Sequence, residues 1–211
     1  MPRITYLGQS GFYLETPVCK FLIDPRNKES GDLDGDLVYC THSHLDHTGG
    51  VKTFLERNPD AVFICNEQVA ERFPQFSDPV QIVGDGDTFE IKSCKFCFTR
   101  LRHGVFGSVF NLAVEVKVGD FIFAHCGDAV SFDGFPSSSV SVLVIPIGGG
   151  FSANPKKAMN MILSIPEPTP TIVPMHWLFR NPKNFCKKLR SIRADVNCIV
   201  PKNGEPLRGY E

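Results

Sequence analysis

Three histidines and one aspartate fall within six residues of this 211-residue chain, in the stretch THSHLDHTGG at residues 41–50. His42 and His44 are two residues apart, so in an extended segment both rings point to the same side. Asp46 and His47 follow where the chain is expected to turn, just before a predicted helix. The spacing therefore offers an imidazole pair and a carboxylate–imidazole pair, close together but aimed differently.

Nitrogen and carboxylate groups of this kind are ligands that suit zinc, and manganese or iron also accept them. Two adjacent pairs favour two metal ions, which lie roughly 3.5–4 Å apart in such sites. Coincidence is the alternative interpretation, because each histidine taken alone suits a core or surface position. Four such residues at this spacing favour the metal site, whose structural context has to agree.

The elements that must position these residues are mostly strands. Runs rich in β-branched and aromatic residues predict strands within residues 3–16, 19–25, 36–42, 61–66, 79–84, 87–101, 111–119, 120–128, 140–149 and 171–177. Helices are expected at 49–59, 66–73, 154–165 and 181–192, the last three opened by asparagines that suit N-caps. This order predicts an α/β fold in which sheets pack together with helices outside, as a single domain over residues 1–211.

Composition excludes several classes of protein. A formal net charge of −1 provides no overall basic field for nucleic acid. No apolar run approaches the roughly 18 residues of a membrane span, and the N-terminus has no signal-peptide core, so we expect a cytoplasmic protein without a membrane partner. The eight cysteines are then expected to be buried free thiols. Cys94 and Cys97 form a CxxC, but within a strand and without a second CxxC, which favours structural thiols over a zinc site.

The motif resembles the HxHxDH signature of the metallo-β-lactamase superfamily of metal-dependent hydrolases. This resemblance implies a four-layer αββα sandwich, with a dinuclear site at one edge of the two sheets. It also implies three further ligands, and the chain has a candidate for each at the end of a predicted strand: His103 in RLRHGVF, Asp128 in AHCGDA and His176 in VPMHW. Asp24 in FLIDP matches the early aspartate that supports the site in this family.

The resemblance also divides the ligands between two ions. His42, His44 and His103 would hold the first, Asp46, His47 and His176 the second, and Asp128 both. Three neutral imidazoles leave an open position on an ion, and the pKa of a bound water falls from about 15.7 to about 7 in such sites. We therefore predict two divalent ions, zinc before manganese or iron, a hydroxide between them as nucleophile, and Asp46 and Asp128 as catalytic residues.

Within this superfamily the chain is similar to the small stand-alone hydrolases that include ascorbate-6-phosphate lactonase. The similarity rests on PRITYLGQSGFYLE, FLIDP, CGDA, IPIGGGFSANPKKA and PMHW, and it extends to the core of the phospholipase D-type enzyme that acts on N-acylated phosphatidylethanolamine. RNA-cleaving members carry an inserted domain or a tRNA-binding arm, for which 211 residues leave no room. Diiron members usually have glutamate where His44 stands, and many true β-lactamases have cysteine as the bridging ligand, whereas here Cys126 precedes Asp128 by two residues.

Three further features bear on catalysis. His125, three residues before Asp128, is predicted to protonate a leaving alkoxide, or alternatively to be hydrogen-bonded within its strand. The loop at 148–157 combines glycines with a helix N-terminus, which suits a phosphate near Lys156 and Lys157; the alternative is a plain turn with two solvated lysines. Aromatic residues close to the ligands predict an aromatic-walled pocket, formed by Phe106, Phe151, Trp177 and Phe179.

The favoured function is a dinuclear metal-dependent hydrolase of a small phosphorylated or lactone-type substrate. A phosphodiesterase or nuclease-type metallohydrolase is the alternative, disfavoured because the sequence shows no dense basic patch for nucleic acid. A non-catalytic metal-binding protein is the third hypothesis. The sequence is compatible with a homo-oligomer, and it identifies neither the substrate nor the metal.

Overall fold

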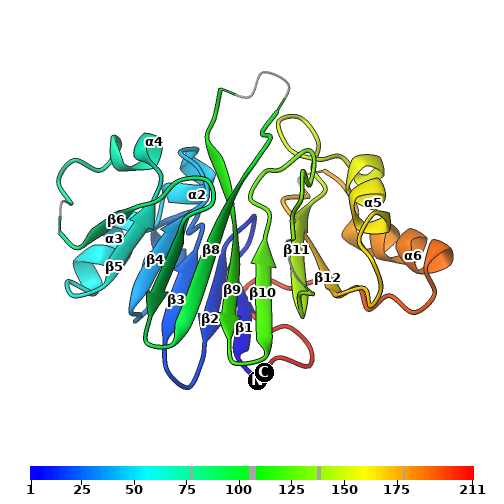
Figure 1. Ribbon diagram of the computed structural model, residues 1–211, viewed down its shortest axis with the longest axis horizontal. Helices are drawn as coiled ribbons and strands as arrows, with labels where there is room; N and C mark the ends of the chain where they lie inside the picture. Colours follow the sequence, from blue (N-terminus) through cyan, green and yellow to red (C-terminus); the bar gives the residue numbers. More distant parts are fainter. Residues whose placement is uncertain (77, 105–107, 137–138, 178) are drawn as a thin grey trace.

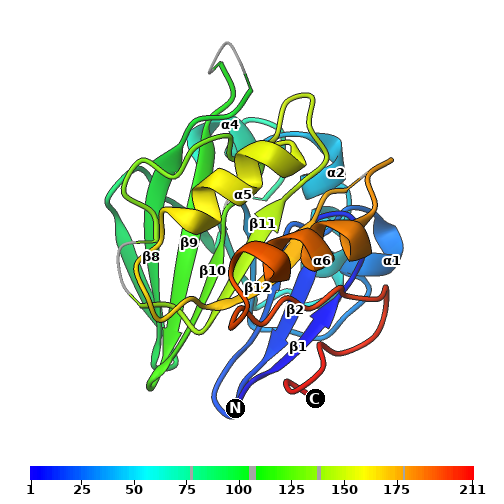
Figure 2. The same ribbon diagram turned by 90° about the vertical axis from the view of Figure 1, so that its right-hand side faces the viewer.

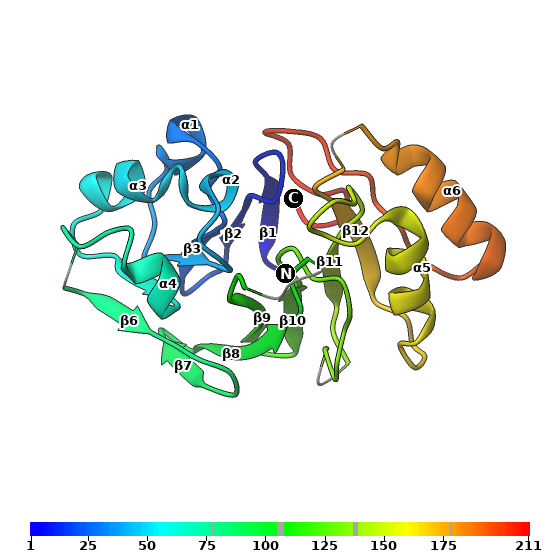
Figure 3. The ribbon, with the colours of Figure 1, turned by 90° about the horizontal axis from the view of Figure 1, so that it is seen from above.

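Two six-stranded sheets stack face to face in the computed structural model of this protein, which describes residues 1–76, 78–104, 108–136, 139–177 and 179–211. In Figure 1, β8 and β9 of the second sheet lie in front of strands of the first sheet, and both chain termini lie at the lower edge of the sandwich. Figure 3 shows helices α1 to α4 outside the first sheet and α5 and α6 outside the second. The expected four-layer αββα sandwich is therefore confirmed.

The first sheet contains the N-terminal strands in sequence order: β1 (Arg3–Tyr6), β2 (Phe12–Glu15), β3 (Lys20–Ile23), β4 (Leu37–Cys40), β5 (Val62–Cys65) and β6 (Val80–Ile82). β1, β2 and β3 pair antiparallel, and β3 to β6 pair parallel. The predicted strand at 3–16 is thus a hairpin of two strands. Its turn contains Gln9, whose φ of 56° lies in the left-handed region, and this breaks the extended run.

The second sheet has the spatial order β12-β11-β10-β9-β8-β7. Its strands are β7 (Thr88–Ile91), β8 (Cys94–Leu101), β9 (Asn111–Val118), β10 (Phe121–His125), β11 (Val142–Pro146) and β12 (Thr171–Met175). β7 to β10 are antiparallel, and β10, β11 and β12 are parallel. The predicted strand at 87–101 is a hairpin because Lys92 and Ser93 turn the chain with positive φ. Near the end of the chain, an isolated parallel bridge joins Cys198 to Ile172.

The helices are short on the first sheet and longer on the second: α1 (Lys28–Gly31), α2 (Leu45–Thr48), α3 (Val51–Arg57), α4 (Glu67–Ala70), α5 (Pro155–Leu163) and α6 (Pro182–Ile192). The side chains of Asn66, Asn154 and Asn181 cap α4, α5 and α6 as predicted, each accepting backbone N–H bonds. In Figure 2, α5 and α6 lie in front of β11 and β12. Within the described residues, no helix is both long and apolar enough to cross a membrane.

Apolar residues fill the space between the sheets and beneath both helical layers. Fully buried rings such as Phe21, Phe96 and Phe98 meet in the central layer. A second cluster joins α5 and α6 to the outer face of β11 and β12, and a third joins α3 to β3, β4 and β5. Packing in these three clusters holds the sheets and helices together, and this fixes where the strands end and where the loops that follow them lie.

The cysteines follow the expectation at six positions and depart from it at two. Cys94 and Cys97 lie in β8 as free thiols, one buried and one half-buried. Cys186 and Cys198, however, form a disulfide with their Cα atoms 5.5 Å apart. The prediction of free thiols is wrong for this pair, because the chain after α6 returns beside β12 and brings Cys198 back to Cys186 in that helix.

Candidate metal centre

The seven predicted ligands meet at one edge of the sandwich, opposite the chain termini (Figure 1). β4 is parallel to its neighbours in the first sheet, and β8, β10 and β12 share one direction in the second. The carboxyl ends of strands are where α/β sheets commonly place binding residues. The segment after β4 carries His42, His44, Asp46 and His47, and the segments after β8, β10 and β12 carry His103, Asp128 and His176, respectively.

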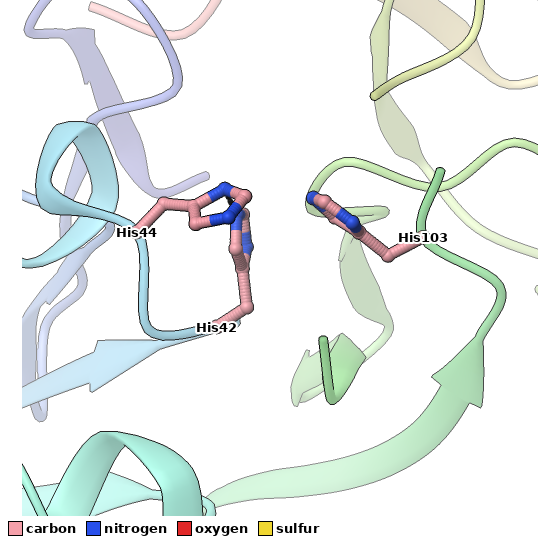
Figure 4. Close-up of side chains that lie close together, drawn as sticks. All are labelled: His42, His44 and His103. Carbon is pink, nitrogen blue, oxygen red and sulfur yellow. Dashed lines mark hydrogen bonds between the residues drawn. The ribbon is translucent and has the colours of Figure 1, made fainter. Parts of the chain in front are cut away.

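The first ligand group is a set of three imidazoles. His42 and His44 come from the segment after β4 and His103 from the segment after β8, and Figure 4 shows their rings gathered around a common space. His42 Nε2 lies 3.1 Å from His44 Nδ1. The His103 ring centroid lies 4.8 Å from that of His42 and 4.9 Å from that of His44. One ion can therefore contact all three residues.

The second ligand group combines a carboxylate with two imidazoles. Asp46 Oδ2 lies 3.2 Å from His176 Nε2 and 3.9 Å from His47 Nε2. His47 is fully buried, His176 is nearly so, and Asp46 is partly exposed. The second group therefore opens toward solvent on the side of Asp46.

Asp128 lies between the two groups. Its Oδ1 is 3.7 Å from His47 Nε2, and its Oδ2 is 3.3 Å from His176 Nε2 and 4.0 Å from His103 Nε2. The same carboxylate also belongs, with His42 and His47, to a third set of convergent ligand atoms. The Asp128 side chain thus reaches toward both ligand groups.

The donor set has the properties that a cation requires. Among the described residues, three buried side-chain atoms have no hydrogen-bond partner: His103 Nε2, Asp128 Oδ1 and His176 Nδ1. Leaving such groups unpaired costs about 1–3 kcal/mol each, and native proteins rarely do so without a reason. Asp128 Oδ1 lies 3.7 Å from His47 Nε2, and His103 Nε2 lies 4.0 Å from Asp128 Oδ2, so a divalent ion among these atoms would satisfy both Asp128 Oδ1 and His103 Nε2. The residues present therefore fit the predicted metal ions.

The electrostatics of the first group favour neutral imidazoles, the form that binds a cation. Burial lowers the pKa of His42 well below its usual value, and the neighbouring histidines lower it further. Burial likewise lowers the pKa of His103 and of His44.

In the second group, nearby carboxylates favour the positively charged form of histidine. Burial acts to lower the pKa of His47, but the carboxylates of Asp24 and Asp128 outweigh it and raise that pKa to about 9. For Asp46, burial opposes ionisation, but the hydrogen bond with His176 and the nearby charge of His47 bring its pKa well below the usual value. Positive charge is therefore attracted to this position.

Asp24 positions His47 from outside the ligand set. Its side chain is fully buried, with Oδ2 2.7 Å from His47 Nδ1. The same carboxylate accepts hydrogen bonds from the backbone N–H and the hydroxyl of Thr41, at 2.8 and 2.7 Å. This contact occupies Nδ1 and leaves Nε2 of His47 directed at the ligand group, as carboxylate partners commonly do for metal-binding histidines.

Sequence reasoning missed the turn between β1 and β2, which holds the second group in place. Gln9 Nε2 donates to Asp46 Oδ2 at 3.1 Å, and the carbonyl of Gln9 accepts from the backbone N–H of His176 at 2.8 Å. Ser10 Oγ lies 3.2 Å from His47 Nδ1. Gln9 and His176 both have positive φ, which is uncommon for residues other than glycine. The sequence signal was the polar QS pair inside an otherwise apolar run.

Asn111, at the start of β9, was also missed, and it positions Asp128. Its Oδ1 accepts from the backbone N–H of Asp128 at 3.0 Å, and its Nδ2 donates to the carbonyl of Cys126 at 3.0 Å. Gly127 makes this contact fit, because its φ is +57° and a Cβ there would lie 2.1 Å from Asn111 Oδ1. A lone asparagine heading an apolar strand was the available signal.

His125 does not face the ligand groups in the way that a general acid requires. The residue is fully buried, its Nε2 lies 2.9 Å from the carbonyl oxygen of Ser10, and its Nδ1 accepts from the N–H of Gly127 at 3.1 Å. Both ring nitrogens are occupied by backbone groups, so neither is available to a leaving group. The structure therefore favours the alternative, a histidine hydrogen-bonded at the end of its strand.

Changing His125 to alanine is expected to destabilise the fold, because it leaves the Ser10 carbonyl and the Gly127 N–H unpaired at about 1–3 kcal/mol each. Urea unfolding measures that loss. Relative to the wild type, the variant should lose the same factor in kcat on two esters. One has a 4-nitrophenol leaving group, and the other has an alkoxide leaving group. A loss confined to the alkoxide ester would restore the general-acid assignment.

The loop at 148–157 packs against the second group without directing its lysines there. A Cβ on Gly148 would lie 2.2 Å from the carbonyl oxygen of His176, so glycine permits this close approach. Lys156 lines a cavity between α5 and α6, and Lys157 lines a different cavity beside residues 130–136. Neither cavity is lined by any of the seven predicted metal ligands. The structure thus favours the turn with two solvated lysines over the phosphate site.

The predicted aromatic wall is present only in part. Phe151 and Phe179 are exposed. Trp177 is half-buried instead, packing on Tyr6 with ring centroids 5.4 Å apart. Phe106 lies outside the described residues. Of the described members, Phe151 alone has a ring contact with the ligands, 6.2 Å from His103 between centroids.

Comparison with known proteins places this geometry in context. The family model for the beta-lactamase superfamily domain matches residues 3–176. A UPF0173 metal-dependent hydrolase from Aeropyrum pernix is 27% identical, covering 97% of this chain and 96% of its own length. One from Opitutus terrae is 28% identical, covering 98% and 95%, respectively.

Solved structures agree in fold. Igni18, described as a novel metallo hydrolase from Ignicoccus hospitalis, superposes with a TM-score of 0.83 at 22% identity, over 97% of both chains. An isothiocyanate hydrolase from Delia radicum gut bacteria superposes with a TM-score of 0.76 at 16% identity, also over 97% of both chains. At these identities the likeness concerns the fold.

Proposed function

This chain belongs to the β-lactamase superfamily of metal-dependent hydrolases, and we propose that it uses two divalent metal ions to hydrolyse a small phosphorylated or lactone-type substrate. The observation that carries this proposal is the pair of ligand groups joined by Asp128, with the buried atoms His103 Nε2 and Asp128 Oδ1 unpaired between them. A purely structural cluster of this kind would leave buried polar atoms without compensation.

The first ion would be held by His42, His44 and His103, the second by Asp46, His47 and His176, and both by Asp128. When bound, such ions, zinc or by the same donor chemistry manganese or iron, supply Lewis acidity that activates water and polarises the scissile bond. Asp46 is the partly exposed carboxylate of the set, and Gln9 fixes its Oδ2. It is positioned to accept a hydrogen bond from the attacking water and so to orient it.

A cation beside the ligands supports an anionic group on the substrate. Arg72 is exposed, and its guanidinium Nη1 donates to the carbonyl of Ser43, the residue between His42 and His44. Its positive charge therefore lies at the margin of the first group, where it would attract a phosphate or carboxylate. A phosphodiesterase remains the alternative, and a net charge of −1 continues to disfavour a nucleic-acid substrate.

Chelation followed by reconstitution tests this proposal. Protein stripped with a chelator should be inactive, and reloading with zinc or manganese should restore turnover at about two ions per chain, measured by atomic emission. A sugar-phosphate lactone and a phosphodiester are assayed side by side. Opening of the lactone supports the proposal, cleavage of the phosphodiester alone supports the alternative, and inactivity of the reloaded protein on both contradicts it.

A further inference from the structure

The ring of Phe151 lies directly against two metal ligands. It is stacked on His103, with an interplanar angle of 12° and centroids 6.2 Å apart, and meets His44 edge-on at 6.4 Å. Nevertheless, 65% of the residue's surface is exposed. Phe151 therefore contributes little to the core while presenting an apolar surface beside the ligand groups.

The backbone around Phe151 is held by segments that carry ligands. Its carbonyl accepts from the N–H of Gly104, next to His103, at 2.7 Å. Two residues further on, the N–H of Ala153 donates to the carbonyl of Ala129, next to Asp128, at 3.1 Å. The backbone of Phe151 thus has a fixed place beside the segments of His103 and Asp128 before any substrate arrives, and such preorganisation reduces the cost of binding.

Two other exposed apolar side chains lie on ligand-bearing segments. Leu45 stands between His44 and Asp46 and is 67% exposed, and Phe179 follows His176 by three residues and is fully exposed. Neither is needed by the core clusters, in which they do not take part. Exposed apolar side chains next in sequence to polar site residues are available for contact with a substrate.

We propose that Phe151 is a specificity-determining residue that selects substrates carrying a planar apolar group, such as an aromatic ring, beside the hydrolysed bond. The planar group packs against the exposed part of the Phe151 ring, and the scissile bond then lies at the ligand groups. This placement of the bond rests on the function proposed above, whereas the affinity for planar groups does not depend on turnover.

Equilibrium binding tests the proposal without any reaction. Phenylphosphonate and methylphosphonate carry the same anionic head, so titration calorimetry of each into the zinc-loaded protein isolates the planar group. The wild type should bind phenylphosphonate more tightly by a factor on the order of 3 to 10, the scale of one aromatic pair. Phe151→Ala should lose this preference, and Phe151→Leu should keep only part of it.

Val18→Ala is the matched control, because Val18 is an exposed apolar residue on the turn between β2 and β3, away from the ligands. It should retain the wild-type preference. The zinc content and melting temperature of every variant are measured. These values show whether a substitution has disturbed metal binding by His103 or the stability of the fold. Equal affinities in the wild type, binding of neither phosphonate, or a preference that survives in Phe151→Ala would each overturn the proposal.

A second measurement separates this inference from the proposed function. Dihydrocoumarin and δ-valerolactone share a six-membered lactone and differ by one fused arene. The ratio of their kcat/KM values is measured for the wild type and for Phe151→Ala. Because the leaving groups are the same for both proteins, the change in this ratio reports the contact with Phe151. The ratio should fall by the same factor as the binding preference. Failure of the reloaded wild type to open either lactone would count against the proposed lactone substrate, while the phosphonate preference would still decide the role of Phe151.

Discussion

Changing Asp128 to asparagine is expected to reduce turnover by more than about 100-fold, beyond the 10- to 100-fold that changes to outer-shell partners cost. The amide removes the negative charge that lies between His47 Nε2 and His176 Nε2, at 3.7 and 3.3 Å from its oxygens. It also replaces one of two acceptor oxygens by a donor, so the side chain can no longer serve both ion positions. The metal content should fall from about two ions per chain toward one.

Asp120→Asn is the matched control for that experiment. Asp120 is an exposed aspartate in the turn before β10, at the opposite end of the strand from Asp128. The backbone bond from Asp128 to Asn111 does not involve the substituted carboxylate, so the fold of Asp128→Asn should persist. Atomic emission and steady-state kinetics are the two readouts. Unchanged metal content together with an unchanged rate would overturn the ligand assignment.

Changing Asp24 to alanine is expected to affect both stability and metal affinity. The substitution leaves the N–H and hydroxyl of Thr41 and Nδ1 of His47 without their buried acceptor. Breaking a buried charged pair of this kind costs about 3–5 kcal/mol of unfolding free energy. Because His47 also loses the contact that orients its ring, metal affinity should fall by about 10- to 100-fold.

Asp24→Asn separates the two effects, because the amide keeps the volume and one acceptor oxygen while losing the charge. Urea unfolding of the metal-free variants gives the stability, and competition with a metallochromic chelator gives the affinity. We expect the asparagine variant to recover most of the stability and less of the affinity. Wild-type metal affinity in both variants would show that Asp24 has no positioning role.

The sequence pattern predicted those parts of the site in which the interacting residues are close together along the chain. HxHxDH depends on spacing along one segment, where an extended run followed by a turn already aims His42 and His44 one way and Asp46 and His47 another. The caps at Asn154 and Asn181 are equally local, since an asparagine side chain reaches the N–H groups of its own helix. His103, Asp128 and His176 were named as candidate ligands by the family resemblance alone, and each follows a strand.

Tertiary structure alone decided contacts between residues far apart in the chain. His125 has Ser10 as its partner, 115 residues away, and this contact turns a candidate acid into a buried hydrogen-bonded residue. Cys186 meets Cys198 because the last segment returns beside β12, and Asn111 meets Asp128 because β9 begins where β10 ends. Sequence determined which chemical groups and local turns this protein has; sheet packing decided which of those groups face one another, because hydrogen bonding and burial depend on distances that no local pattern encodes.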